Sequence, residues 1–287
     1  MTTKLDVSRP GSDPRNALLL GEACSLAYLD GPQAAAGFRE KLGLEARLIS
    51  VDNTQVYVAQ SPDLVLAAFR GSECPTSLDG FKDWLLTNAN NYLILPEGRI
   101  GTDFVAAGVG ARFHRGFMAA LEAIWTPLHA AVAEEMNRAR RPLWITGHSL
   151  GGALALLSAW RFERKFLKVD QVVTYGAPMI GNETAAAAFQ KRFGDRITRY
   201  VNFEDPVPLL PSISLLTNAY VHCPTEVSLR DDPAATSALE ALKQAADAPA
   251  LHAGLIDGVW GAVQGRIAAH FIDHYLGRVR RKLDGGG

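Results

Sequence analysis

A serine between two glycines, Gly147-His148-Ser149-Leu150-Gly151, lies between a strand pattern and a helix pattern. The apolar run LWIT leads into this motif, and LGGALALLSAW, with apolar residues at helical spacing, leads out of it. Such a strand-turn-helix bend lifts the serine hydroxyl above the sheet, and a side chain at either flanking glycine would collide with a neighbouring element. The pattern predicts a nucleophilic Ser149, and a serine that merely caps a helix is the alternative.

Strand and helix patterns alternate around this motif. Apolar runs typical of buried strands occupy residues 64–69, 143–147 and 169–176. Between them, residues 116–139 and 150–166 carry apolar side chains at helical spacing. This alternation predicts the α/β class, with a mostly parallel sheet and helices on both of its faces.

Further elements are predicted toward both ends of the chain. The turn signals Asp52-Asn53 and Ser61-Pro62-Asp63 divide residues 47–70 into three short strands. Later patterns indicate a strand at 197–203, a late strand or hairpin arm at 220–229, a surface excursion at about 230–251 and an amphipathic helix at 270–283. Because there is no internal repeat and no linker, we expect a single domain over residues 1–287.

The composition excludes several classes of partner and location. The 29 Lys and Arg residues against 30 Asp and Glu leave a net charge of −1, which lacks the basic excess of a nucleic-acid-binding protein. No run approaches the ~18 apolar residues of a transmembrane helix, and the first residues lack the pattern of a signal peptide. Cys24, Cys74 and Cys223 cannot all pair with one another. We therefore expect a cytoplasmic protein without a transmembrane segment; the sequence does not indicate the oligomeric state.

A nucleophilic serine needs a base to take its proton and a carboxylate to hold that base in the correct tautomer. In a fold with this bend, the nucleophile comes first in the chain, then the acid, then the histidine. That order excludes the histidines up to His148. The candidates that remain are His222, His252, His270 and His274.

The predicted acid is Asp205, which follows an apolar strand pattern in NFEDPVPLLP. Strand ends of an open sheet meet at the site, so a carboxylate in this position can reach the histidine. Its neighbour Glu204 is the rival. Neighbouring side chains leave a strand in opposite directions, so only one of the two carboxylates can face the site.

The reaction also needs donors for the oxyanion that forms during acyl transfer. The residue after the nucleophile, Leu150, supplies one backbone N–H. A second donor is expected from a loop after an earlier strand, and Ser72, directly after Phe69-Arg70-Gly71, is the candidate. An ordinary polar turn residue is the alternative for Ser72.

Taken together, these segments resemble the class 3 lipases of the α/β-hydrolase fold, the group of the fungal triacylglycerol lipases and their bacterial and plant relatives. The resemblance covers about residues 64–211, with a weaker C-terminal part. The motifs, in chain order, are similar to the family's oxyanion loop (AFRGS, 68–72), acidic-Trp element (KDWLLT, 82–87), helix start (FHRGF, 113–117), nucleophile elbow (TGHSLGGALA, 146–155), next strand end (YGAPMIGN, 175–182) and catalytic Asp segment (RYVNFEDPVPLLP, 199–211).

The resemblance implies a serine ester hydrolase with Ser149 as nucleophile and Asp205 as acid, with Ser72 and Leu150 at the oxyanion and no metal or organic cofactor. The family often ends in a histidine followed five positions later by a tyrosine, which His270 and Tyr275 match. His270 is therefore the predicted base and His274 the runner-up. If both were helical, their i and i+4 spacing would place them on one face.

The resemblance also implies the substrate class, an acyl ester of a lipid or small alcohol, acylglycerols first. A phospholipase or an acyltransferase on the same triad is the alternative within enzymes, and a catalytically silent module that binds a lipid or a partner is the alternative outside them. Residues 73–83 are a possible lid insertion, which would contact a lipid interface transiently. The segment holds few large apolar side chains, so a surface loop is its other interpretation.

Overall fold

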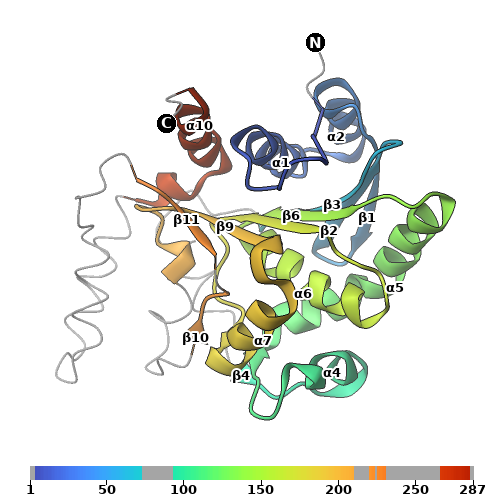
Figure 1. Cartoon of the computed structure of the whole chain (residues 1–287), viewed down its shortest axis with the longest axis vertical. Coiled ribbons are helices and arrows are strands. Elements are labelled where there is room, and N and C mark those ends of the chain that lie inside the picture. The colour runs from blue at the N-terminus through green and yellow to red at the C-terminus, as the bar shows by residue number, and fades with distance from the viewer. Residues whose placement is uncertain (1–3, 73–92, 210–219, 224, 231–265, 285–287) are drawn as a thin grey trace.

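The computed structural model describes residues 4–72, 93–209, 220–223, 225–230 and 266–284. A seven-stranded sheet forms the centre of this part of the chain, in the order β1-β2-β3-β6-β7-β9-β11 (Figure 1). Its strands are β1 (Glu45–Val51), β2 (Thr54–Gln60), β3 (Val65–Phe69), β6 (Leu143–His148), β7 (Gln171–Tyr175), β9 (Ile197–Asn202) and β11 (Glu226–Leu229).

The sheet is parallel from β3 to β11 and antiparallel at its N-terminal edge. β3, β6, β7, β9 and β11 pair in parallel, each with the next. β1 pairs antiparallel with β2, and β2 with β3, through the two turns predicted from the sequence. The predicted mostly parallel sheet is confirmed.

Helices cover both faces of the sheet, as predicted. In Figure 1, α1 and α10 lie above the sheet and α5, α6 and α7 below it. The helices are α1 (Pro14–Leu26), α2 (Gly31–Gly37), α4 (Gly98–Phe104), α5 (Arg115–Arg138), α6 (Leu150–Arg164), α7 (Glu183–Phe193) and α10 (Ile272–Asp284). Shorter turns are the π-helix η1 (Phe38–Leu42) and the 3₁₀ helices η2 (Val105–Ala107), η3 (Gly194–Arg196), η4 (Val207–Leu209) and η5 (Ile267–His270).

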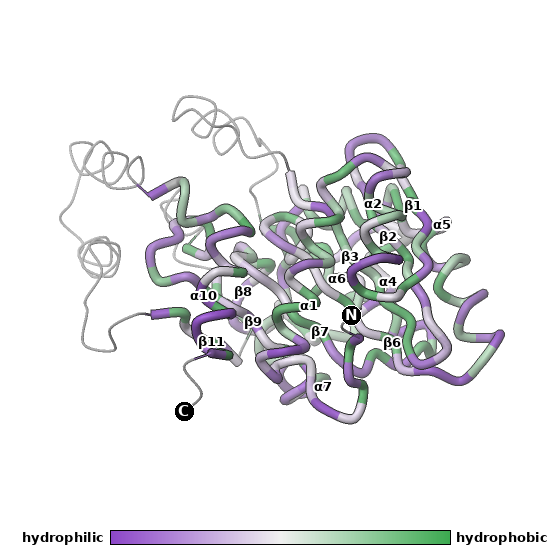
Figure 2. The backbone as a smooth tube through the Cα atoms, turned by 90° about the horizontal axis from the view of Figure 1, so that it is seen from above, coloured by the Kyte–Doolittle hydropathy of each residue, from purple (hydrophilic) through white to green (hydrophobic). Residues whose placement is uncertain are grey.

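Each face of the sheet carries its own hydrophobic core. In β3 the side chains of Val65, Ala67 and Phe69 join the core between the sheet and helices α5 and α6. Those of Leu66 and Ala68 join the core between the sheet and α1. This period of two explains why the strand is continuously apolar. α1 is hydrophobic along much of its length and α10 is mostly hydrophilic, which is visible in Figure 2.

A second, small sheet was not predicted. Its order is β10-β8-β5-β4, with β4 (Leu93–Ile94), β5 (Phe113–His114), β8 (Gly181–Asn182) and β10 (Tyr220–Val221). The late strand or hairpin arm expected at 220–229 is present as two separate short strands, so its extent as one element is corrected. β10 pairs with β8 in the small sheet, β11 pairs with β9 in the large one, and Thr225, directly before β11, has a φ of 68°.

The predicted C-terminal helix is broken. η5 ends at His270, Phe271 has extended backbone (φ −62°, ψ 140°), and α10 begins at Ile272. His270 and His274 are therefore not on one helix, and the expectation that they could share a helical face is corrected.

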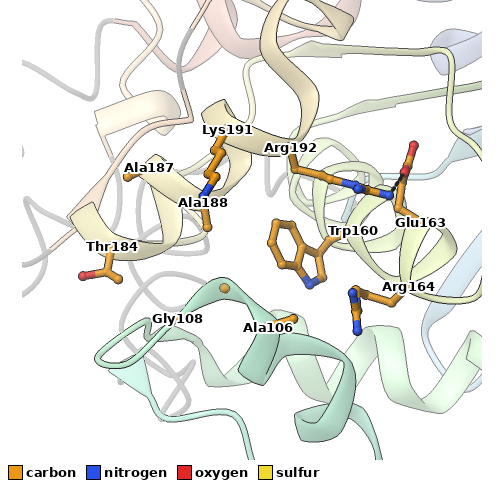
Figure 3. Close-up of a pocket in the computed structure, with 11 residues that line it drawn as sticks. Ala106, Gly108, Trp160, Glu163, Arg164, Thr184, Ala187, Ala188, Lys191 and Arg192 are labelled. Carbon is orange, nitrogen blue, oxygen red and sulfur yellow. Dashed lines mark hydrogen bonds and ion pairs between the residues drawn. The ribbon is translucent and has the colours of Figure 1, made fainter.

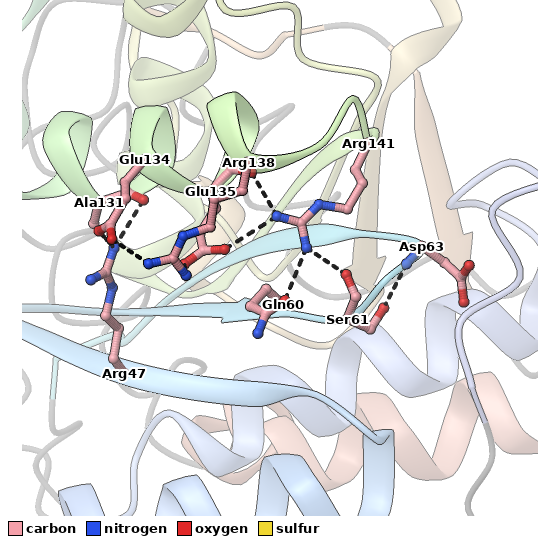
Figure 4. A network of polar contacts seen from close by, with 9 residues as sticks. All are labelled: Arg47, Gln60, Ser61, Asp63, Ala131, Glu134, Glu135, Arg138 and Arg141. Atoms are coloured by element: carbon pink, nitrogen blue, oxygen red, sulfur yellow. Dashed lines mark hydrogen bonds and ion pairs between the residues drawn. The ribbon is translucent and has the colours of Figure 1, made fainter.

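A buried arginine ties the end of α5 to the sheet (Figure 4). Nη1 of Arg141 donates to Oε1 of Gln60 at 2.9 Å and to the carbonyl oxygen of Ser61 at 2.6 Å, and Nη2 donates to Glu135. Arg141 and Glu135 are both buried, so the cost of removing their charges from water is offset by several hydrogen bonds rather than by one ion pair.

Several predictions fall outside the described residues. These are the insertion at 73–83, the KDWLLT element, Cys74, His252 and nearly all of the excursion at 230–251. The single domain over 1–287 stays a prediction. Among the helices that the structure describes, none has the length and apolar character needed to cross a bilayer.

Candidate active site

Ser149 lies at the bend between β6 and α6 in a strained conformation. Its φ of 57° and ψ of −131° are unusual for a residue with a side chain, and such strain is found where a residue is held for function. Ser149 occupies the cap position of α6, yet its side chain makes no capping hydrogen bond. This geometry does not support the alternative of a helix-capping serine.

The two flanking glycines permit the bend for steric reasons. A Cβ atom at Gly147 would lie 2.2 Å from the carbonyl oxygen of Gly151, and one at Gly151 would lie 2.4 Å from the carbonyl oxygen of Phe69. Both contacts are with backbone, of α6 in the first case and of β3 in the second, which cannot move aside without distorting that element. The motif is therefore a fixed element of the fold.

Asp205 and His270 form a buried pair. Oδ2 of Asp205 lies 2.8 Å from Nδ1 of His270, and the two residues are 2% and 1% exposed. Because a carboxylate only accepts hydrogen bonds, Nδ1 carries the proton and Nε2 keeps its lone pair. His270 is thus held in the tautomer that a general base needs.

Two more donors fix the Asp205 carboxylate. Tyr275, from α10, donates its hydroxyl proton to Oδ2 at 2.5 Å, and the backbone N–H of Val207 donates to Oδ1 at 2.8 Å. The rival acid Glu204 is only half-buried, and its Oε2 lies 3.5 Å from Nη2 of Arg278. The structure brings Asp205, not Glu204, to the histidine.

The other candidate histidines lie elsewhere. His274 is exposed on α10. Nε2 of His222 lies 2.5 Å from the carbonyl oxygen of Pro208. The structure therefore pairs Asp205 with His270. The sequence signal for this histidine was Tyr275, five residues later, and the hydroxyl of Tyr275 also binds Asp205.

The end of β7 holds the serine bend beside the Asp205–His270 pair. The backbone N–H of Ser149 donates to the carbonyl oxygen of Tyr175 at 2.9 Å. A Cβ atom on the next residue, Gly176 (φ +58°), would lie 2.7 Å from Oδ2 of Asp205 and 3.2 Å from Cε1 of His270. Ser149 after β6 and Asp205 after β9 therefore lie on either side of the carboxyl end of β7, and His270 from η5 joins them there.

The two predicted oxyanion residues border the same bend. Leu150 is the first residue of α6, so its N–H has no acceptor within the helix and lies at the positive end of the helix dipole. Ser72 is half-buried and follows Gly71, where a Cβ atom would lie 3.2 Å from Cβ of Ser149. Ser72 is therefore next in the chain to a residue in contact with the serine bend.

Sequence reasoning missed two side chains beside the site, His148 and Tyr28. Nδ1 of His148 lies 2.8 Å from the hydroxyl of Tyr28, and Nε2 of His148 lies 2.7 Å from the carbonyl oxygen of His270. Burial and the neighbouring His270 lower the pKa of His148 well below its usual value. Chain order excluded His148 as the base, and no pattern in the sequence linked Tyr28 to residues so distant in the chain.

A cavity of about 550 Å³ lies between η2, α6 and α7 (Figure 3). Trp160 faces it, and Arg192 pairs with Glu163 at its edge. None of the predicted site residues lines this cavity. Within the described ranges, no group of three or more His, Cys, Asp or Glu side chains is arranged to hold a metal ion.

A family model described as "Lipase (class 3)" matches residues 66–215, which include the serine bend and Asp205. The chain belongs to the class 3 lipases. The C-terminal His270 lies beyond the matched residues, so its place in the site rests on the geometry described above.

Individual relatives of this class 3 lipase are moderately similar in sequence. "Secreted mono- and diacylglycerol lipase 3" of Gibberella zeae is 29% identical over 167 residues, which are 57% of this chain and 49% of the relative. "Phospholipase A(1) DAD1, chloroplastic" of Arabidopsis thaliana is 29% identical over 160 residues, 53% of this chain and 34% of the relative. The matches thus span half or less of these curated relatives.

Among solved structures, the triacylglyceride lipase of Rhizomucor miehei aligns with a TM-score of 0.58 and 21% identity. The alignment covers 77% of this class 3 lipase and 82% of the Rhizomucor chain. At this identity the likeness shows the fold, and it confirms the α/β-hydrolase fold expected from the sequence.

Proposed function

We propose that this chain is a serine ester hydrolase that cleaves acyl esters, acylglycerols first, through an acyl-enzyme on Ser149. The observation that carries the proposal is the buried Asp205–His270 pair, 2.8 Å apart, beside the strained serine bend. A serine, a histidine in the basic tautomer and a carboxylate that orients it are the groups that acyl transfer requires.

In the proposed reaction, Oγ of Ser149 attacks the ester carbonyl carbon while Nε2 of His270 takes the hydroxyl proton. The negative charge of the tetrahedral intermediate is bound by the Leu150 N–H and by the N–H or hydroxyl of Ser72. His270 then gives its proton to the leaving alcohol, which leaves an acyl ester on Ser149.

Deacylation repeats these steps with water. His270 takes a proton from the attacking water, the carbonyl carbon regains a tetrahedral geometry, and the proton returns to Oγ of Ser149 as the carboxylic acid departs. Asp205 keeps its hydrogen bond to Nδ1 throughout and stabilises the charged imidazole. The proposed steps use only side chains and backbone of this chain, in one domain.

The substrate within this class is a finer proposal. The Gibberella relative is named for mono- and diacylglycerols, which favours acylglycerols, while the Arabidopsis relative is named a phospholipase A1. The alternatives on the same triad are therefore phospholipid hydrolysis and transfer of the acyl group to an alcohol. Contact with a lipid interface through residues 73–83 belongs to the same proposal.

A series of p-nitrophenyl esters of increasing acyl length, measured below and above the solubility limit, tests the proposal. A steep rise in rate at the emulsion boundary supports a lipase, and an optimum at short chains in solution supports an esterase. Product analysis with diacylglycerol, phosphatidylcholine and an added alcohol separates the three reactions. Ser149→Ala is the control, and unchanged hydrolysis in that variant contradicts the proposed mechanism.

The rival from another class is a silent module that binds a lipid or partner. The complete Asp205–His270 pair argues against it, because loss of activity commonly removes a catalytic group. Binding of an ester without hydrolysis by the wild-type chain would favour the module over the enzyme.

The cellular location is also a proposal, and two observations favour opposite answers. Cys24 and Cys223 are buried and free, which fits the reducing cytoplasm expected from the sequence. The relatives above are named as secreted and chloroplastic proteins. Cell fractionation decides between them, since recovery from the medium or an organelle contradicts a cytoplasmic location.

A further inference from the structure

The buried His148 makes two hydrogen bonds that the proposed reaction does not use. It is the last residue of β6, directly before Ser149, and is 4% exposed. Nε2 lies 2.7 Å from the carbonyl oxygen of His270, and Nδ1 lies 2.8 Å from the hydroxyl of Tyr28. One imidazole thus joins the strand of the nucleophile to the backbone of the predicted base.

The partners of His148 determine its tautomer. A carbonyl oxygen only accepts, so Nε2 must carry the proton and donate it to His270. In the neutral ring Nδ1 then accepts, and the hydroxyl of Tyr28 donates to it. Burial favours this neutral form, since the charged ring would lose its hydration.

Few bonds hold the backbone around His270, and one of them runs from Nδ2 of Asn202 to the carbonyl oxygen of the preceding residue, Ala269, at 2.7 Å. His270 ends the four-residue 3₁₀ helix η5, and the extended residue Phe271 separates this helix from α10. The side-chain bond to Asp205 restrains the ring at Nδ1, whereas the bond from His148 restrains the main chain. The two imidazole rings lie 4.6 Å apart, centre to centre.

Tyr28 extends the same contacts to the oxyanion loop. It follows α1 in the chain, and a Cβ atom at Gly71 would lie 2.1 Å from its hydroxyl and 2.7 Å from the carbonyl oxygen of His148. Tyr28 and His148 therefore touch the segments that carry Ser72, Ser149 and His270.

We propose that His148, held by Tyr28, is a positioning residue that fixes the main chain of His270 relative to Ser149. The inference rests on the proposed hydrolase function and adds a residue to it. His148 acts through the position of His270 and does not touch the reacting atoms. Because a displacement of about 1 Å between reacting groups can cost about 10²-fold in rate, its loss reduces the rate of chemistry rather than substrate binding.

Two substitutions at position 148 separate the two hydrogen bonds. The short amide of His148→Asn can reach the place of Nδ1 but not that of Nε2, so it loses the bond to His270. The longer amide of His148→Gln can place an N–H near Nε2 and restore that bond. We expect kcat on a soluble p-nitrophenyl ester to fall about 10- to 100-fold in His148→Asn, with KM within about threefold of wild type. His148→Gln should recover a large part of kcat.

The rate of phosphonylation of Ser149 by a fluorophosphonate is the second measurement, because it reports on nucleophile activation without ester turnover. It should fall by the same factor as kcat in His148→Asn. Tyr28→Phe keeps the ring but removes the donor to Nδ1, and a smaller loss of kcat is expected. If the position-148 variants do not fold, Tyr28→Phe carries the test alone.

Matched controls separate positioning from general stability. His114 is as buried as His148, and its Nδ1 caps α5. His114→Asn should therefore lower Tm while kcat stays within about twofold. Tyr200→Phe is the matched control for Tyr28→Phe. It also removes a tyrosine hydroxyl, one that donates to the carbonyl oxygen of Ser12, and should leave kcat unchanged.

The inference is overturned if His148→Asn keeps the wild-type kcat, if His148→Gln is as impaired as His148→Asn, or if a folded Tyr28→Phe variant has unchanged kcat and labelling rate. Each of these results leaves the proposed function intact, because the wild-type chain still hydrolyses esters. A wild-type chain that neither hydrolyses esters nor reacts at Ser149 overturns the proposed function, and this inference with it.

Discussion

The hydroxyl of Tyr275 donates to Oδ2 of Asp205 at 2.5 Å, the same oxygen that accepts from Nδ1 of His270 at 2.8 Å. The Tyr275 hydroxyl also accepts from the backbone N–H of Asn202 at 3.1 Å. The first turn of α10 thus fixes the carboxylate of Asp205, which lies shortly after the end of β9.

Replacing Tyr275 by phenylalanine should therefore affect both stability and rate. The Tyr275→Phe change leaves Asp205 with one donor fewer and the Asn202 N–H without this acceptor, which costs about 1–3 kcal/mol of unfolding free energy. Because Asp205 then holds His270 less firmly, we expect kcat to fall severalfold. Urea unfolding and ester hydrolysis measure the two effects, and Tyr200→Phe is the control in which only stability falls. An unchanged kcat in Tyr275→Phe contradicts the positioning of Asp205 by α10.

The two C-terminal histidines should respond oppositely to removal. His270→Ala takes away the proposed base, and we expect kcat to drop at least about a thousandfold. His274→Ala changes an exposed side chain on α10 and should leave kcat within about twofold. Measuring kcat and Tm for the pair tests the assignment, which is wrong if His274→Ala is the inactive variant.

The local patterns of the sequence predicted the large sheet and the serine bend, but not the contacts between distant segments. β3 and the run into Ser149 are recognisable because alternate residues pack into opposite cores. The break at Phe271 has no such signal, since residues 270–283 keep an amphipathic spacing through it. His270 lies outside the helix and meets Asp205, and no local apolar pattern encodes a contact across 65 residues.

Tyr28 and the small sheet escaped prediction for the same reason. Tyr28 acquires its place only through contact with His148, 120 residues later in the chain. The strands of the small sheet contain two residues each, too short for a period of two to be visible.

Alanine substitution of two glycines should have opposite effects on stability. Gly151→Ala places a methyl group 2.4 Å from the carbonyl oxygen of Phe69, so we expect loss of folded protein or a strongly lowered Tm. Gly277 lies in α10 with nothing within 4 Å of an added Cβ atom, so Gly277→Ala should stabilise by about 0.5–1 kcal/mol. Thermal unfolding of both variants is the measurement. A Gly151→Ala variant as stable as wild type contradicts the close packing of the bend.

Acid should destabilise the fold through His114. Burial lowers the pKa of His114 to about 4 from the ordinary 6.5, because the charged ring would lose its hydration. The neutral Nδ1 accepts the N–H of Phe117 at 3.2 Å. The unfolded chain therefore takes up this proton first as pH falls below 6.5, and stability is lost progressively down to about pH 4. The loss is about 3 kcal/mol when complete.

Urea unfolding at several pH values from 7 to 4 measures this effect. His114→Asn should lose less stability over that range than wild type, and some acid sensitivity should remain because the pKa of His148 is lowered as well. His274→Ala, an exposed histidine variant, should keep the wild-type slope. Equal slopes in His114→Asn and wild type contradict a neutral, buried His114.

If Ser149 is an activated nucleophile, as proposed, it should form a covalent bond with an electrophilic probe. A fluorophosphonate probe reacts with an activated serine, and peptide mass analysis locates the bond. We predict a single adduct on Ser149, loss of ester hydrolysis in proportion to labelling, and neither labelling nor hydrolysis in a folded Ser149→Ala variant. An adduct on another residue, or ester hydrolysis that persists in Ser149→Ala, would show that Ser149 is not the nucleophile.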